Sequence, residues 1–109
     1  MMIYLKTEHV DEPCELVVSH YVANNQPAIR LVSPDGEPLM TATVCMPNVP
    51  LASWQTIIKD YSENAGVLKC LVANGLVRVL GIVSCGFTKA HIVDLNMEVI
   101  NEHVQQGDR

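Results

Sequence analysis

The sequence predicts an α+β fold, in which an antiparallel sheet of five or six strands carries one main helix and a short C-terminal helix follows. Three observations predict it. Short stretches rich in β-branched residues recur in the first half of the chain, and residues 39–46 alternate between two faces. Residues 59–77, KDYSENAGVLKCLVANGLV, carry the start and stop signals of a helix. A chain of 109 residues, 49% of them hydrophobic, fits a single domain spanning 1–109.

The predicted strands lie on both sides of that helix. We expect extended segments at 15–22, 28–33, 39–46, 53–59, 76–84 and 87–95. The sequence SPDGEP at 33–38 is typical of a tight turn, so the strands that flank it should pair as a hairpin. Gly81 interrupts its strand and predicts a bulge.

The start of the main helix has two candidate caps. Asp60 and Glu63 fit a capping box in which aspartate takes the place of serine or threonine, and Ser62 is the alternative N-cap. Gly66 would cost up to about 1 kcal/mol inside a helix, which indicates that another segment approaches its backbone closely. The expected apolar stripe consists of Ala65, Leu68, Leu71 and Val72.

Both predicted helices have a recognisable terminus. Asn74 and Gly75 predict the end of the main helix, with Gly75 in the left-handed conformation and Leu76 folded back on Leu71 in a Schellman cap. Asn96 is a candidate cap for the C-terminal helix. One face of that helix would carry Met97, Ile100 and Val104.

The charge distribution argues against nucleic acid as a direct partner. Twelve acidic and seven basic residues give a formal net charge of −5, and the basic residues form no cluster. Four acids crowd the start of the chain: Glu8, Asp11, Glu12 and Glu15. This acidic segment is a candidate contact surface for a partner protein, or it serves only solubility.

The cysteines and the chain start indicate a cytoplasmic protein. The four cysteines are widely spaced, the first residues do not resemble a signal peptide, and no apolar run is long enough for a membrane span. The sequence also lacks metal-ligand spacings and phosphate-binding glycine loops, so we expect no metal, no cofactor and no enzymatic activity. The alternative is a reactive thiol at Cys85 with His20 or His91 as its base.

Trp54, the only tryptophan, ends the segment MPNVPLASW at 46–54. It either packs in the core or lies exposed near Val49 and Leu51, where the three side chains would form an apolar patch. Aromatic anchors dominate binding hot spots. We therefore take Val49, Leu51 and Trp54, with the four N-terminal acids, as candidate partner-binding residues.

The sequence IKDYSENAGVLKCLVANGLV at 58–77 resembles the signature of a family of small proteins of phages, plasmids and other mobile elements, classed as a domain of unknown function. The resemblance extends to 28–52 and 84–95, and so covers roughly residues 16–95. Its most specific part is Tyr61-Ser62-Glu63-Asn64 with Gly66, while Ala65 departs from the acid that the family favours. The resemblance carries over no catalytic residue.

The resemblance implies a mobile-element accessory protein that binds and inhibits a host protein. A component of bacterial immunity such as a Cas protein is the expected class of target, which would make this an anti-CRISPR or other anti-defence protein. The alternative is a protein that sequesters a small molecule or nucleotide, which requires a polar pocket and could use Arg30 or Arg78 for an anionic ligand. Exposed sheet edges also favour a homodimer.

Overall fold

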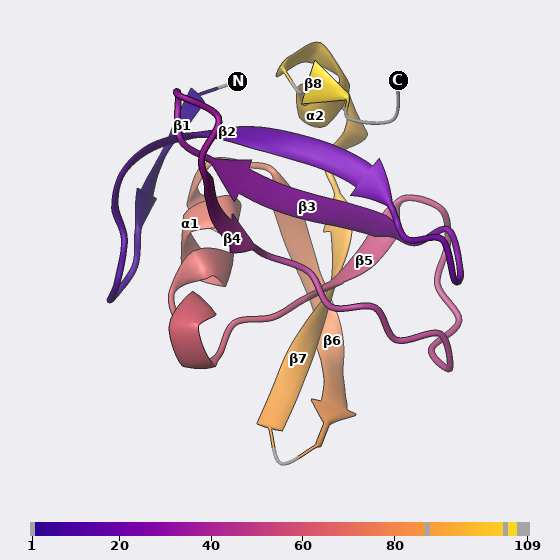
Figure 1. The fold of residues 1–109 in the computed structure, drawn as a ribbon. Coiled ribbons are helices and arrows are strands. Elements are labelled where there is room, and N and C mark those ends of the chain that lie inside the picture. The colour runs from indigo at the N-terminus through magenta and orange to yellow at the C-terminus, as the bar shows by residue number, and fades with distance from the viewer. Residues whose placement is uncertain (1, 87, 104, 107–109) are drawn as a thin grey trace.

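The structure is a computed structural model that describes residues 2–86, 88–103 and 105–106 (Figure 1). Its strands divide between two antiparallel sheets. The first sheet has the order β1-β2-β3-β4, formed by β1 (Met2–Lys6), β2 (Asp11–His20), β3 (Pro27–Val32) and β4 (Pro38–Thr41). The second has the order β5-β7-β6, formed by β5 (Gln55–Ile58), β6 (Val77–Cys85) and β7 (Thr88–Leu95).

A short strand, β8 (Gln105–Gln106), pairs in parallel with β2 at Val17 and Val18. Because β3 occupies one edge of β2 from Glu15 to His20, β8 lies along the other edge, where it continues the position of β1. The first sheet is therefore four strands wide. The predicted single sheet of five or six strands is wrong, and the fold is mostly β with two sheets.

The two sheets separate where the predicted strand at 39–46 changes partners. Only Pro38–Thr41 belongs to the first sheet. The Ala42 N–H donates to a β3 carbonyl at 2.8 Å, and the Val44 N–H donates to a β5 carbonyl at 3.0 Å. The chain thus crosses from one sheet to the other within three residues, as corner strands do in packed sheets. The strand predicted at 39–46 is therefore correct only as far as Thr41, and beyond it Thr43 forms an isolated bridge with Ile58. Alternation of side chains did not specify these partners.

The main helix has two parts, a 3₁₀ turn η1 (Ser62–Asn64) and the helix α1 (Val67–Ala73). Asp60 caps α1, because its carboxylate Oδ1 accepts the N–H groups of Gly66 at 2.9 Å and Leu68 at 3.1 Å. The predicted capping box is wrong, since Glu63 instead pairs with Lys59 at 2.7 Å. The Asp60 side chain thus supplies the capping hydrogen bonds, although it lies six residues before the N-cap position, which Gly66 occupies.

Gly66 precedes α1 as its N-cap, with φ of +103°, and does not lie inside a helix. A Cβ added to Gly66 would lie 3.3 Å from the Cα of Thr7, in the β1–β2 loop. The expected close approach to this glycine is therefore confirmed. The positive φ is a second reason for glycine here, because L side chains rarely adopt it.

The end of α1 follows the prediction. Gly75 has φ of +71°, its N–H donates to the carbonyl of Val72 at 2.9 Å, and the Leu76 N–H donates to the carbonyl of Leu71 at 3.0 Å. These are the two hydrogen bonds of a Schellman cap. Leu71 and Leu76 are fully buried, as expected, whereas Val72 is exposed and does not belong to the buried face.

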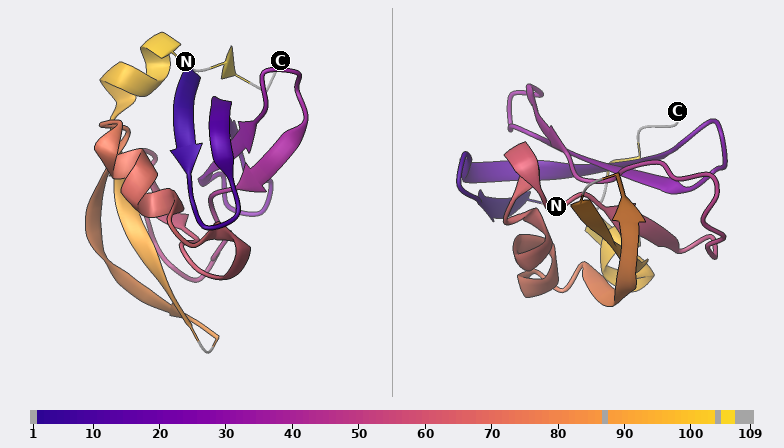
Figure 2. Two further views of the ribbon diagram at one scale, coloured as in Figure 1. Left: turned by 90° about the vertical axis from the view of Figure 1, so that its left-hand side faces the viewer. Right: turned by 90° about the horizontal axis from the view of Figure 1, so that it is seen from below.

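The hydrophobic core lies between one face of the first sheet and a layer formed by α1 and the second sheet (Figures 1 and 2). β1, β2 and β3 contribute Ile3, Leu5, Cys14, Leu16, Ile29 and Leu31; the opposite layer contributes Val67, Cys70, Leu71, Ile58, Val77, Val93 and Leu95. Both layers supply fully buried aliphatic side chains, so their contact is the main source of stability.

The C-terminal helix α2 (Met97–His103) follows β7. As expected, Asn96 caps it: its side-chain Oδ1 accepts the Val99 N–H at 3.4 Å. Ile100, on the same helix, is buried. The expected apolar position Val104 lies outside the described residues. Within the described ranges, no helix has the length and apolar character to cross a membrane.

Candidate functional site

Trp54 lies immediately before β5, with half of its surface exposed. Its carbonyl accepts the Leu95 N–H at 2.8 Å, which ties the end of the 46–54 segment to β7. The indole lines a pocket of about 320 Å³. The other residues of this Trp54 pocket are Gly75, Val77, Arg78, Asp94, Leu95 and Asn96. Trp54 therefore does not pack in the core.

A network of hydrogen bonds centred on Asp94 borders the Trp54 pocket. Strand pairing places Gln55 and Arg78 on either side of Asp94, whose carboxylate accepts Gln55 Nε2 at 3.1 Å and Arg78 Nη2 at 2.7 Å. The hydrogen bond from Arg78, then that from Gln55, with a smaller contribution from Trp54, lowers the pKa of Asp94. The Arg78–Asp94 pair is largely solvent-exposed on the arginine side, so it orients groups more than it stabilises the fold.

Val49 and Leu51 are only half-buried, and neither lines the Trp54 pocket. The segment that carries them is attached to the body, because Gln26 Nε2 donates to the Val49 carbonyl at 3.2 Å. The apolar neighbours of Trp54 come from β6 and β7, far away in the sequence. Periodicity gives no signal for this pocket, since it depends on the register of the second sheet.

The four N-terminal acids lie on and beside the β1–β2 hairpin, but they do not form one row. Glu8 is exposed in the loop, while Asp11 and Glu15 alternate with Glu12 on opposite faces of β2. Asp11 accepts hydrogen bonds from Lys6 Nζ, at 2.8 Å, and from the Tyr4 hydroxyl. The hydrogen bond from Lys6 makes the larger contribution and that from Tyr4 the smaller one, and both lower the pKa of Asp11. The neighbouring lysine therefore offsets one of the four charges.

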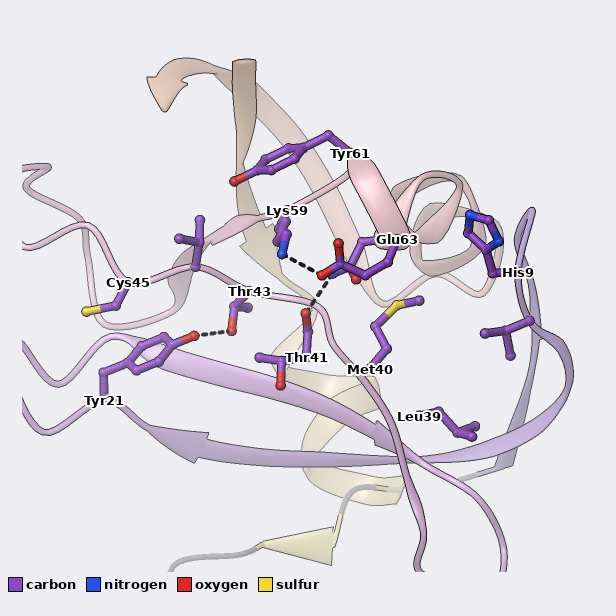
Figure 3. Close-up of a pocket in the computed structure, with 13 residues that line it drawn as sticks. His9, Tyr21, Leu39, Met40, Thr41, Thr43, Cys45, Lys59, Tyr61 and Glu63 are labelled. Carbon is purple, nitrogen blue, oxygen red and sulfur yellow. Dashed lines mark hydrogen bonds and ion pairs between the residues drawn. The ribbon is translucent and has the colours of Figure 1, made fainter. Parts of the chain in front are cut away.

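A larger cavity, of about 540 Å³, opens between β4 and the segment that precedes α1 (Figure 3). We call it the Lys59 cavity. The residues that line it are His9, Val10, Tyr21, Leu39, Met40, Thr41, Thr43, Val44, Cys45, Lys59, Tyr61, Glu63 and Asn64. Tyr21, Thr43 and Cys45 lie at one end, and His9 lies at the other. No local pattern in the sequence predicts that these segments meet, because the corner at 42–44 brings them together.

The polar groups of the Lys59 cavity are held by hydrogen bonds. Lys59 Nζ donates to Glu63 Oε2 at 2.7 Å and lies 5.5 Å from the centre of the Tyr61 ring. That ion pair lowers the pKa of Glu63. Asn64, which is buried, donates through Nδ2 to the Thr41 carbonyl at 2.7 Å. The cavity thus presents one cation, one anion and aromatic rings in a preorganised arrangement.

The thiols differ in their surroundings. Cys14 and Cys70 are buried, and Cys45 is half-buried; all three are free. Burial raises the pKa of the Cys14 thiol to about 11, with a smaller contribution from Cys70, so Cys14 stays protonated at neutral pH. The side chain of Cys85, the candidate nucleophile, lies outside the described part of the chain. Among the described residues, no three His, Cys, Asp or Glu side chains form a group that could hold a metal ion.

No family model, curated protein or solved structure matches this chain.

Proposed function

We propose that this protein is a non-catalytic binding protein that docks on a protein of its host cell and inhibits it, with Trp54 at the centre of the contact surface. The supporting observation is the half-exposed indole beside the Trp54 pocket. Tryptophan and arginine are enriched in hot spots, where an aromatic ring meets a pocket and polar groups surround it. Trp54 with Arg78 and Asp94 has this composition.

The charge of the chain supports a partner of opposite sign. The net charge is −5, and the exposed Glu8 lies in the β1–β2 loop. Acidic surface accelerates association with a basic protein and disfavours acidic competitors. The family resemblance supplies the proposed class of target, a component of bacterial immunity such as a Cas protein, and with it the proposed role of a phage or mobile-element accessory protein.

The test begins with affinity capture on the tagged protein from lysate of its bacterial host, followed by reconstitution of the complex from purified components. We expect one partner in near-equal amount, whose activity falls when the complex forms. Trp54→Ala should weaken binding tenfold or more, as loss of a hot-spot residue does. The control is Val22→Ala, which removes exposed apolar surface outside the Trp54 pocket and should leave the affinity unchanged.

Three results would count against the proposal. Recovery of the bait alone would refute it for that host, and an uninhibited partner would refute the inhibitory role. Equal affinities of wild type and Trp54→Ala, with both proteins folded by circular dichroism, would refute the placement of the contact surface.

A second candidate function is the sequestration of a small polar molecule, which the Lys59 cavity favours. Its volume of about 540 Å³ lies in the range of small-molecule sites, and Lys59, Glu63 and Tyr61 offer ionic and aromatic contacts. The test is the melting temperature in fractionated metabolite extracts. A fraction that stabilises wild type but not Lys59→Met would support sequestration, and the absence of any such fraction would refute it.

A further inference from the structure

Strand β6 forms an unprotected edge of the second sheet. The sheet has the order β5-β7-β6, and no strand in the described part of the chain pairs with the outer side of β6. β6 has nine residues and so extends for about 30 Å at the usual rise per residue. Figures 1 and 2 show the β6–β7 hairpin projecting beyond the rest of the molecule. Apart from the part of β6 that α1 contacts, its outer backbone groups are therefore available to another strand.

The side chains of β6 are apolar at this edge. Val79, Leu80 and Ile82 are 43%, 45% and 59% exposed. Single exposed apolar residues are common on protein surfaces, but monomeric proteins protect edge strands with lysines, prolines or inward-pointing charges. The one Asp, Glu, Lys or Arg of β6 is Arg78, and its charge is paired with Asp94 at 2.7 Å. The edge therefore has the features of a pairing surface.

We propose that two copies of this chain pair antiparallel through β6 and join their second sheets into one six-stranded sheet across a two-fold axis. The bulge between Val79 and Gly81 selects the register. Because Val79 lies opposite Val93 and Ile82 opposite His91, the bulge keeps both side chains on the same face of the sheet. A regular strand would place residues three apart on opposite faces.

Arg78 and Val83 occupy the other face, since they lie opposite Asp94 and Ala90. A two-fold axis between Leu80 and Gly81 then matches the faces of both strands. Val79 lies beside the partner's Ile82 on one face, and Arg78 lies beside the partner's Val83 on the other. Each such contact occurs twice, as in any two-fold interface.

Charge favours a second copy as the occupant of this edge. In the proposed register Arg78 lies beside no positively charged residue of the second copy. The exposed Val79 of each copy is covered by Ile82 of the other. A charged peptide strand from another protein would gain no comparable advantage, because Asp94 already neutralises Arg78. The surface is self-complementary, which is the requirement for a two-fold dimer.

The experiment measures the mass of the purified protein in solution by light scattering over a range of concentrations. Wild type should approach twice the chain mass of 12.0 kDa. Ile82→Lys places two lysines inside the proposed interface and should yield a monomer. The matched control is Val22→Lys, which adds the same charge at a fully exposed valine in the β2–β3 turn and should remain dimeric.

Hydrogen exchange of the wild type gives an independent measurement that needs no variant. The β6 amides should become more protected as the protein concentration rises, whereas the amides of β4 should not. A monomeric wild type at every concentration would overturn the proposal, as would an Ile82→Lys variant that remains a folded dimer. Both measurements use the protein alone, so their outcome is separate from that of the capture experiment.

Discussion

Replacement of Gly66 by alanine tests how the first sheet and α1 are packed together. The new Cβ would lie 3.3 Å from Thr7 Cα and 3.4 Å from Thr7 Cβ, closer than ordinary van der Waals contact. Residue 66 also has φ of +103°, where an L side chain costs about 1–2 kcal/mol. Displacement of the packed β1–β2 loop adds about 1 kcal/mol. We expect Gly66→Ala to lower the free energy of unfolding by about 2–3 kcal/mol, measured by urea denaturation with circular dichroism.

The control is Gly75→Ala, because Gly75 also has a positive φ but its Cβ would meet nothing within 4 Å. Strain alone should cost about 1 kcal/mol there. A double-mutant cycle with Thr7→Gly isolates the contact, since removal of the Thr7 side chain should relieve part of the Gly66→Ala penalty but none of the Gly75→Ala penalty. Equal destabilisation at positions 66 and 75, or no coupling between 7 and 66, would refute this account of the packing.

Two further predictions concern the cap of α1 and a buried thiol. Asp60→Ala should lower the free energy of unfolding by about 1–2 kcal/mol, because the carboxylate accepts two backbone N–H groups at the start of the helix. Asp60→Asn keeps an acceptor and should lose less in the same urea assay; equal losses would contradict the capping role. Alkaline pH should destabilise the protein, since the unfolded Cys14 thiol loses its proton near its ordinary pKa of 9.0 while the folded thiol keeps it to about 11. Stability should therefore fall as pH rises through this window, by up to about 3 kcal/mol, and Cys14→Ala should flatten the decline; parallel pH profiles would count against burial as its cause.

Local patterns predicted those features that neighbouring residues control. Asn74, Gly75 and Leu76 predicted the Schellman cap, because the left-handed glycine and its two hydrogen bonds involve residues within one turn. The turn at 33–38 and the bulge before Gly81 followed from proline and glycine for the same reason. These features depend little on the rest of the fold.

The start of the helix shows where local reasoning failed. Asp60 and Glu63 have the spacing of a capping box, yet Glu63 pairs with Lys59 and Asp60 bonds to residues six and eight positions later. Gly66, with φ of +103°, turns the chain between η1 and α1 and packs closely against Thr7. That contact joins segments about sixty residues apart, so the sequence near the helix does not contain it.

The sequence by itself determined most strands, the end of the main helix and the acidic charge of the chain, because each depends on composition or on neighbours along the chain. The tertiary structure decided that the strands form two sheets, through the change of partner after β4. It also decided that the half-exposed Trp54 lines one pocket with Asp94 and that the edge of β6 is apolar. These outcomes depend on strand partners and register, which are set by contacts between distant segments that a local pattern of alternation does not specify.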